Sequence, residues 1–202
     1  MNRIITIGRE FGSGGRELGR RLSEALGFAY YDQEIIIEIS KRSSLSEQYV
    51  QAIVEHQPVF SFPIHIGRSF YPSPNPSFEN SMAIYREQSR IISEMAAKSS
   101  CIIVGRCADY ILKQYRPFRI FVYADMASKM KRCREKASEN EKMAMTEKEL
   151  RQQIAKIDKK RAKYYEFYTG HPWGDPLNFD LCINTTQTVI KEIVPAIAKL
   201  FV

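Results

Sequence analysis

The stretch Thr6–Leu22, TIGREFGSGGRELGRRL, gathers five glycines between an apolar run and a helical pattern. A loop between a buried strand and a helix binds phosphate through free backbone N–H groups and the helix dipole, and glycines let the ligand approach closely. The pattern G-x-x-x-x-G-K-[ST] nevertheless fails. With Gly15 as its second glycine, Arg16 stands at the lysine and Glu17 at the hydroxyl residue. Two interpretations stay open: a phosphate site with altered chemistry, or a glycine-rich connector with solvated arginines.

Short apolar runs alternate with longer helical patterns along the chain. Five runs predict strands: Arg3–Gly8, Phe28–Tyr31, Cys101–Gly105, Arg119–Tyr123 and Asp180–Asn184. The first, third and fourth are almost continuously apolar, which is typical of strands buried on both faces of a parallel sheet. We expect Gly27 to end the first helix, and Thr146 with Glu149 to form a capping box that opens a long one. This alternation favours a doubly wound α/β domain.

The bulk composition bounds the class of protein. A chain of 202 residues with 44% apolar content can bury one sizeable α/β core. The net charge of +7 points to an anionic partner, a class that includes nucleotides, nucleic acids and acidic surfaces. The N-terminus does not resemble a signal peptide, and no stretch approaches the roughly 20 apolar residues of a membrane span. The four cysteines form no C-x-x-C pair, so we expect buried reduced thiols in a cytoplasmic protein.

One segment interrupts this alternation. Residues Gln57–Asn80, QPVFSFPIHIGRSFYPSPNPSFEN, combine five prolines with five aromatic residues. The segment is too apolar for a free linker and too rich in proline for a regular element. It is interpreted equally well as a long surface excursion or as a mobile flap over a ligand.

Polar residues directly follow two of the predicted strands. Asp32 ends the second strand, and Gly105 with Arg106 ends the third. The carboxyl ends of strands in an open α/β sheet face the ligand crevice, so these residues could point to the same place as the glycine loop. The alternatives are a helix N-cap for Asp32, a surface position for Arg106 and a simple turn at Gly105.

The helix that begins at Thr146 carries an arginine on its apolar stripe. Arg161 should therefore face inward, where it needs an anion or a carboxylate, and Asp158 three residues earlier can orient it. The alternative is a surface ion pair within the helix. On the preceding basic helix, Arg132 belongs either to a lid or to a solvated face.

Together these stretches resemble the cytidylate-kinase-like branch of the P-loop nucleoside monophosphate kinases. The resemblance is carried by the motifs REFGSGGRELGRRL, YYDQEII, VGRCADYIL and DKKRAKYYEFYTG…WGDP…FDLCINT, which span nearly the whole chain. Asp158 and Arg161 match the ends of the family's Asp-Ser-x-Arg motif, whereas Lys159 replaces its serine. The resemblance implies one P-loop NTPase domain over 1–202, a five-stranded parallel sheet with helices on both faces. It also implies an acceptor-side flap or helical insertion at 44–99 and a lid region at 125–168.

The resemblance also implies phosphoryl transfer from ATP to a nucleoside monophosphate, with CMP or dCMP favoured. The residues expected to bind the donor phosphates are Gly12, Ser13, Gly14, Gly15, Arg16 and Glu17. Those expected to act in catalysis are Arg16, which replaces the lysine, together with Arg132, Arg161 and Asp158. Those expected on the acceptor side are Asp32, Gly105 and Arg106. No protein metal site is expected, and Mg²⁺ would be held through water.

Two other functions remain as alternatives. A P-loop kinase of another small metabolite would keep the donor loop and differ in the Gln57–Asn80 segment. A non-catalytic protein would bind a nucleotide, or use its positive charge to hold nucleic acid. The concentration of arginines at predicted strand and helix ends argues against a broad nucleic-acid face, so we expect small-molecule nucleotides as partners.

Overall fold

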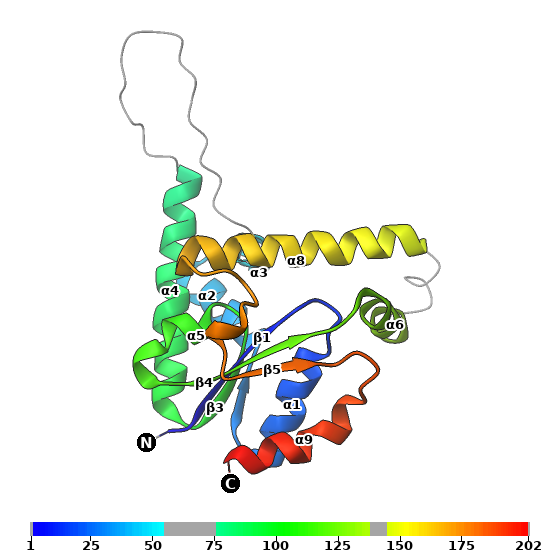
Figure 1. Ribbon diagram of the computed structural model, residues 1–202. Coiled ribbons are helices and arrows are strands. Elements are labelled where there is room, and N and C mark those ends of the chain that lie inside the picture. The colour runs from blue at the N-terminus through cyan, green and yellow to red at the C-terminus, as the bar shows by residue number, and fades with distance from the viewer. Residues whose placement is uncertain (1, 55–75, 138–144, 202) are drawn as a thin grey trace.

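A five-stranded parallel sheet forms the centre of the computed structural model, which describes residues 2–54, 76–137 and 145–201 (Figure 1). The strands are β1 (Ile4–Arg9), β2 (Ala29–Tyr31), β3 (Cys101–Val104), β4 (Phe118–Tyr123) and β5 (Leu181–Asn184). They lie in the order β2-β3-β1-β4-β5, so β1 is the middle strand. Each predicted strand is confirmed to within one residue at either end. The extra residue of β1 is Arg9, which pairs with Val122 of β4.

Helices cover both faces of this sheet, and the fold class predicted from the sequence is confirmed (Figure 1). The α-helices are α1 (Gly15–Leu26), α2 (Glu34–Ser43), α3 (Glu47–Val54), α4 (Pro76–Lys98), α5 (Ala108–Ile111), α6 (Met126–Lys136), α8 (Glu147–Thr169) and α9 (Ile190–Ala198). Short 3₁₀ turns are η1 (Lys113–Tyr115), η2 (Pro176–Asn178) and η3 (Lys199–Phe201). Helices α1 and α9 pack on one face, and α2, α4, α5 and the end of α8 pack on the other. Within the described ranges no helix is long and apolar enough to cross a membrane.

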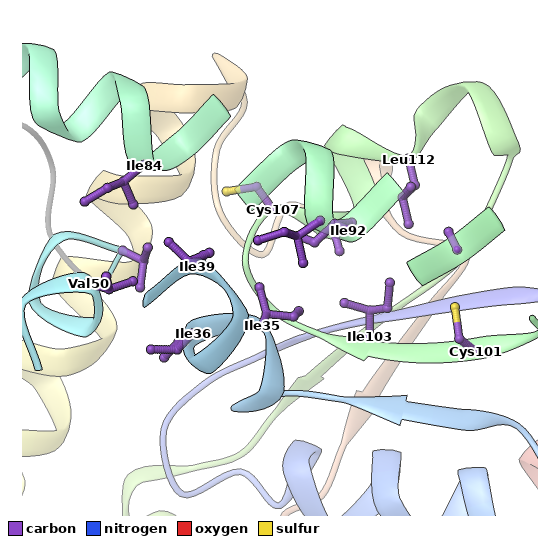
Figure 2. Close-up of a cluster of buried hydrophobic side chains, with 14 of the residues drawn as sticks. Ile35, Ile36, Ile39, Val50, Ile84, Ile92, Cys101, Ile103, Cys107 and Leu112 are labelled. Carbon is purple, nitrogen blue, oxygen red and sulfur yellow. The ribbon is translucent and has the colours of Figure 1, made fainter. Parts of the chain in front are cut away.

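Successive residues of the central strands point to opposite faces. Ile5 and Ile7 belong to the core beneath α1 and α9, whereas Ile4 belongs to the core beneath α2 and α4. In β3, Cys101 and Ile103 face that second core, as Figure 2 shows, and all four residues of the strand are buried. Burial on both faces is why these strands are almost continuously apolar in the sequence.

The boundary signals of two helices act as predicted. Gly27 ends α1 with a left-handed φ of 66°, a conformation that glycine adopts without a steric penalty. At the start of α8 the hydroxyl of Thr146 accepts from the Glu149 amide, and the Glu149 carboxylate accepts from the Thr146 amide. This capping box fixes where α8 begins.

The segment rich in proline and aromatic residues is only partly described. Residues 57–75 lie outside the described residues, as do 138–144 of the predicted lid region. Residues 76–80 form the first turn of α4, so the expectation of irregular structure is wrong for this end of the segment. Pro76 is tolerated there because the first turn of a helix needs no backbone donor.

All four cysteines are free thiols. Cys101 and Cys107 are buried, whereas Cys133 and Cys182 are half-buried. Burial raises the pKa of the Cys101 thiol to about 11. The expectation of buried reduced thiols is thus confirmed for two of the four.

Candidate functional site

The glycine loop runs from the end of β1 at Arg9 to the start of α1 at Gly15. Gly12 and Gly14 have φ values of 74° and 85°, in the left-handed region that favours glycine. A Cβ on Gly12 would lie 2.9 Å from the backbone oxygen of Lys129, so a side chain does not fit there. Gly14 is the N-cap of α1 and has no side chain to offer its first amides. A helix start built in this way is suited to an anion.

Ser13 and Arg132 support this loop from below. Ser13 is fully buried, and its hydroxyl donates to the backbone oxygen of Glu10 at 2.8 Å. The Thr185 hydroxyl donates to the backbone oxygen of Ser13 at 2.7 Å. Arg132 donates to the backbone oxygens of Thr185 and Thr188, which ties α6 to the segment after β5. The phosphate-binding role of Ser13 and the catalytic role of Arg132 remain predictions, and the observed contacts of both residues support the loop and the segment after β5.

A buried lysine, not singled out in the sequence, joins the loop to two helices. Lys129 of α6 places its Nζ 2.8 Å from both the Glu10 and the Asp158 carboxylates. Asp158 of α8 also accepts from the backbone N–H of Phe11 at 2.7 Å. Burial acts to lower the pKa of Lys129, but the hydrogen bonds to the two carboxylates outweigh it and the net pKa is raised. Asp158 thus positions the loop itself, in addition to any influence on Arg161.

Asp32 faces the glycine loop rather than its own helix. Its carboxylate forms ion pairs with Arg16 and, at 3.5 Å, with Nη2 of Arg9. The N-cap of α2 is Gln33, and the backbone N–H of Asp32 donates to the Glu34 carboxylate. The helix-cap alternative for Asp32 is therefore wrong. The side chain of Arg16 is 62% exposed, so most of it lies in solvent at the mouth of the loop.

Arg9, at the end of β1, is the most buried arginine of the loop and is not among the residues predicted from the sequence. Its side chain is only 11% exposed. Burial, and next the charge of Arg161, lower the pKa of Arg9 to about 9, while Asp32 acts in the opposite direction. A Cβ on Gly105 would lie 1.7 Å from Nη1 of Arg9, so the guanidinium rests against the backbone of that glycine. Arg9 therefore connects the ends of three strands.

The turn after β3 is held in an uncommon backbone conformation. Gly105, Arg106 and Cys107 have φ values of 76°, 60° and 54°, and two of these residues are not glycine. The buried Gln88 donates to the backbone oxygen of Arg106 at 3.0 Å, and Nη1 of Arg106 donates to the backbone oxygen of Val54 at 3.5 Å. Left-handed residues at such a position are typical of functional turns.

Arg161 lies inward, as the stripe on its helix predicts. Its side chain is 19% exposed, and its Nη1 donates to the backbone oxygen of Arg9 at 3.4 Å. The distance from Nη1 to the Asp158 carboxylate is 3.9 Å, whereas the guanidinium carbon lies 5.6 Å from the centre of the Phe11 ring. Arg161 is therefore not part of a surface ion pair, and Asp158 is engaged more closely by Lys129.

Glu17, a predicted phosphate ligand, forms ion pairs with two neighbouring basic side chains. Its carboxylate lies 2.9 Å from Arg21 and 3.1 Å from Lys136. Burial acts to raise the pKa of Glu17, but the hydrogen bonds from Lys136 and Arg21 outweigh it and the pKa is lowered. A role in phosphate binding for Glu17 remains a prediction.

Two of the pockets at the loop share lining residues. The first has a volume of about 460 Å³ and lies between the loop, α6 and the first half of α8. The second, of about 50 Å³, lies between the ends of β1 and β3 and the last turns of α8. Arg9 and Arg161 line both pockets. A basic boundary therefore separates a space beside the glycine loop from a space beside Arg106.

The sequence from residue 4 to residue 187 matches the model of the cytidylate kinase-like family. The chain belongs to the cytidylate kinase-like family. A cytidylate kinase from Staphylothermus marinus is 24% identical to it over 190 residues, which cover 94% of this chain and 90% of that protein. The family resemblance expected from the motifs is confirmed.

Solved structures agree on the fold. An uncharacterized protein from Eubacterium ventriosum is 27% identical, with a TM-score of 0.70 and 98% of each chain covered. A shikimate kinase from Bacteroides thetaiotaomicron is 14% identical, with a TM-score of 0.57 and 98% of each chain covered. The chain therefore has a P-loop kinase fold, with a glycine loop that departs from the usual pattern.

Within the described ranges no group of three or more His, Cys, Asp or Glu side chains could hold a metal ion. Glu10, Asp32 and Asp158, three acidic residues that contact the loop, are all paired with cations. Arg16 and Glu17 occupy the first turn of α1, and neither has the hydroxyl that serves as a ligand in the usual pattern. Water-mediated binding of Mg²⁺ remains a prediction.

The contact between Gly105 and Arg9 can be tested by a glycine substitution. We expect Gly105→Ala to lower the free energy of unfolding by about 1–3 kcal/mol, because it strains a left-handed residue and displaces the Arg9 guanidinium. Gly27→Ala is the matched control, since Gly27 has a similar φ but nothing within 4 Å of its Cβ position. Urea unfolding should show the larger loss for Gly105→Ala. Equal losses would mean that Arg9 does not occupy this space.

Proposed function

We propose that the protein transfers the γ-phosphoryl group of ATP to a nucleoside monophosphate, with CMP or dCMP as the favoured acceptor. The observation that carries this proposal is the basic boundary of Arg9 and Arg161 between two pockets, beside a glycine loop at a helix N-terminus. Membership of the cytidylate kinase-like family supports the choice of acceptor.

The chemistry asks little of the protein beyond position and charge. An oxygen of the acceptor phosphate attacks the γ-phosphorus, the bond to the β–γ bridging oxygen breaks, and ADP leaves. Donor phosphates would lie along the loop amides from Gly12 to Arg16, with the acceptor near Arg106. Negative charge builds up between the two phosphates, where Arg9 and Arg161 can neutralise it without reorganising.

Helices α6 and α8 would form the lid over the donor pocket. Both helices line the first pocket, and the ion pair of Lys129 with Asp158 joins them at 2.8 Å. Because Asp158 also accepts a hydrogen bond from the backbone N–H of Phe11, a shift of either helix would displace the loop. This coupling supports a role for 125–168 in closing the site.

A kinase of another small metabolite is the second candidate. The fold is shared with shikimate kinases, which act on an acceptor that is not a nucleotide. The same donor loop and boundary arginines would serve both reactions, because only the acceptor side differs.

A coupled assay of ADP release separates these functions. We expect turnover with CMP or dCMP well above the background without acceptor, and weaker turnover with UMP, AMP and GMP. Turnover with shikimate and with no monophosphate would favour the second candidate. If ATP raises the melting temperature of the wild-type protein but no added acceptor leads to ADP release, the protein binds nucleotides without catalysis.

A further inference from the structure

The start of α1 identifies which glycine of the loop corresponds to the second glycine of the usual pattern. The helix begins at Gly15, directly after the left-handed Gly14. With Gly14 in that place, the pattern G-x-x-x-x-G-K puts its first glycine at position 9 and its lysine at position 15. Position 9 is Arg9 and position 15 is Gly15. In this register glycine and cation have changed places.

The two exchanged positions are in direct contact. A Cβ on Gly15 would lie 2.6 Å from the Cβ of Arg9 and 3.3 Å from a side-chain carbon of Val122. Two side chains therefore cannot occupy positions 9 and 15 together. An arginine fits at position 9 because position 15 is a glycine.

The side chain of Arg9 reaches the junction of the two pockets. It passes Gly15, rests against Gly105 and ends 3.5 Å from Asp32. Burial and, next, the positive charge of Arg161 lower the pKa of Arg9 to about 9. Asp32 opposes this shift, but its carboxylate is shared with Arg16. A polyphosphate that binds beside a buried cation in such surroundings stabilises the positive charge of that cation.

Several other cations around the donor pocket have partners of their own. Arg16 is largely exposed and paired with Asp32. Arg132 donates to two backbone oxygens, and Lys136 is paired with Glu17. Lys129 is held between two carboxylates. Arg9 and Arg161 line both pockets, and Arg9 is the one of the two that belongs to the glycine loop.

We propose that Arg9 replaces the missing loop lysine as the cation that contacts the transferring phosphoryl group, reaching it from β1 instead of from α1. This inference rests on the proposed function and names the catalytic cation of that same site. In this proposal Arg9, and not Arg16 as predicted from the sequence, takes the place of the lysine. Arg16 pairs with Asp32 at the mouth of the loop.

The test compares Arg9→Met and Arg9→Lys with the wild type. Methionine keeps much of the side-chain volume and removes the charge, so the ligand-free protein should melt at the same temperature as the wild type or higher. The upward shift in Tm produced by ATP or by tripolyphosphate should be lost, and kcat should fall by about 10²–10³-fold. Arg9→Lys should recover part of both. Arg20→Met, which removes an exposed arginine of α1, is the control and should change neither.

A second variant tests the exchange itself. Arg9→Gly/Gly15→Lys restores the glycine and the lysine of the usual pattern, and should regain part of the ATP-dependent shift that Arg9→Gly alone loses. A double variant no better than Arg9→Gly would contradict the exchanged register.

The outcomes separate this inference from the proposed function. An unchanged ATP shift and kcat in Arg9→Met would overturn the inference, as would a lower Tm without ligand combined with a normal ATP shift, which indicates a structural role only. If the wild type binds ATP but phosphorylates no monophosphate, the proposed acceptor fails while the binding arm still decides the role of Arg9. A wild type that neither ATP nor tripolyphosphate stabilises would overturn both.

Discussion

Replacing Lys129 with methionine should lower the free energy of unfolding by about 3–5 kcal/mol, because it leaves two carboxylates without their shared cation. Methionine fills a similar volume, so little of the loss comes from packing. Glu10 and Asp158 would then repel each other beside the loop. Urea unfolding at neutral pH measures the effect.

Lys131→Met is the matched control on the same helix. The side chain of Lys131 is 78% exposed and lies 4.0 Å from Glu135, so its removal should cost less than about 1 kcal/mol. Burial already raises the pKa of Asp158 above its ordinary value of 3.8. As the pH falls, Asp158 is therefore protonated at a higher pH in the folded state than in the unfolded state. The loss in Lys129→Met should therefore shrink in mildly acidic buffer. Equal losses in the two lysine variants would show that Lys129 does not anchor the loop.

Removing Arg161 should slow the reaction by about 10²–10³-fold while leaving the fold nearly intact. In Arg161→Ala the charge beside the moving phosphoryl group is lost, but α8 keeps its capping box and its buried residues. The lost hydrogen bond to the Arg9 carbonyl is long, at 3.4 Å, so we expect less than about 1 kcal/mol in stability. Steady-state kinetics and thermal melting together measure both effects.

Arg151→Ala controls for the loss of an arginine from the same helix, since Arg151 is exposed. It should change neither kcat nor Tm. Asp158→Ala should behave differently from both: Asp158 accepts from the Phe11 amide and from Lys129, so its removal should mainly destabilise the protein. Wild-type turnover in Arg161→Ala would remove Arg161 from the reaction.

The fold could be predicted from the sequence because its signals are local. Strands buried on both faces leave continuous apolar runs, as at Cys101–Val104, and such runs need no knowledge of their neighbours. Gly27 and the capping box of Thr146 are likewise decided within a few residues. The start of α4 at Pro76 was missed, because proline in a first helical turn looks the same in a sequence as proline in a loop.

The site was harder to predict because its contacts join residues far apart in the chain. Lys129 looks like one lysine of a basic helix until the structure places it between Glu10 and Asp158. Arg9 was overlooked because the apolar run ends at Gly8, although the missing lysine was itself a signal to look for another cation. The inward direction of Arg161 could be predicted, since helical periodicity alone decides it.

The central claim is that ATP and a nucleoside monophosphate exchange a phosphoryl group at this site. Phosphorus NMR of the wild-type protein with ATP and CMP tests it most directly, because it identifies both products. We expect ADP and CDP to form in equal amounts, and we expect Arg9→Met and Arg161→Ala both to slow their formation. ADP accompanied by inorganic phosphate and no CDP, or no reaction with any monophosphate, would contradict it.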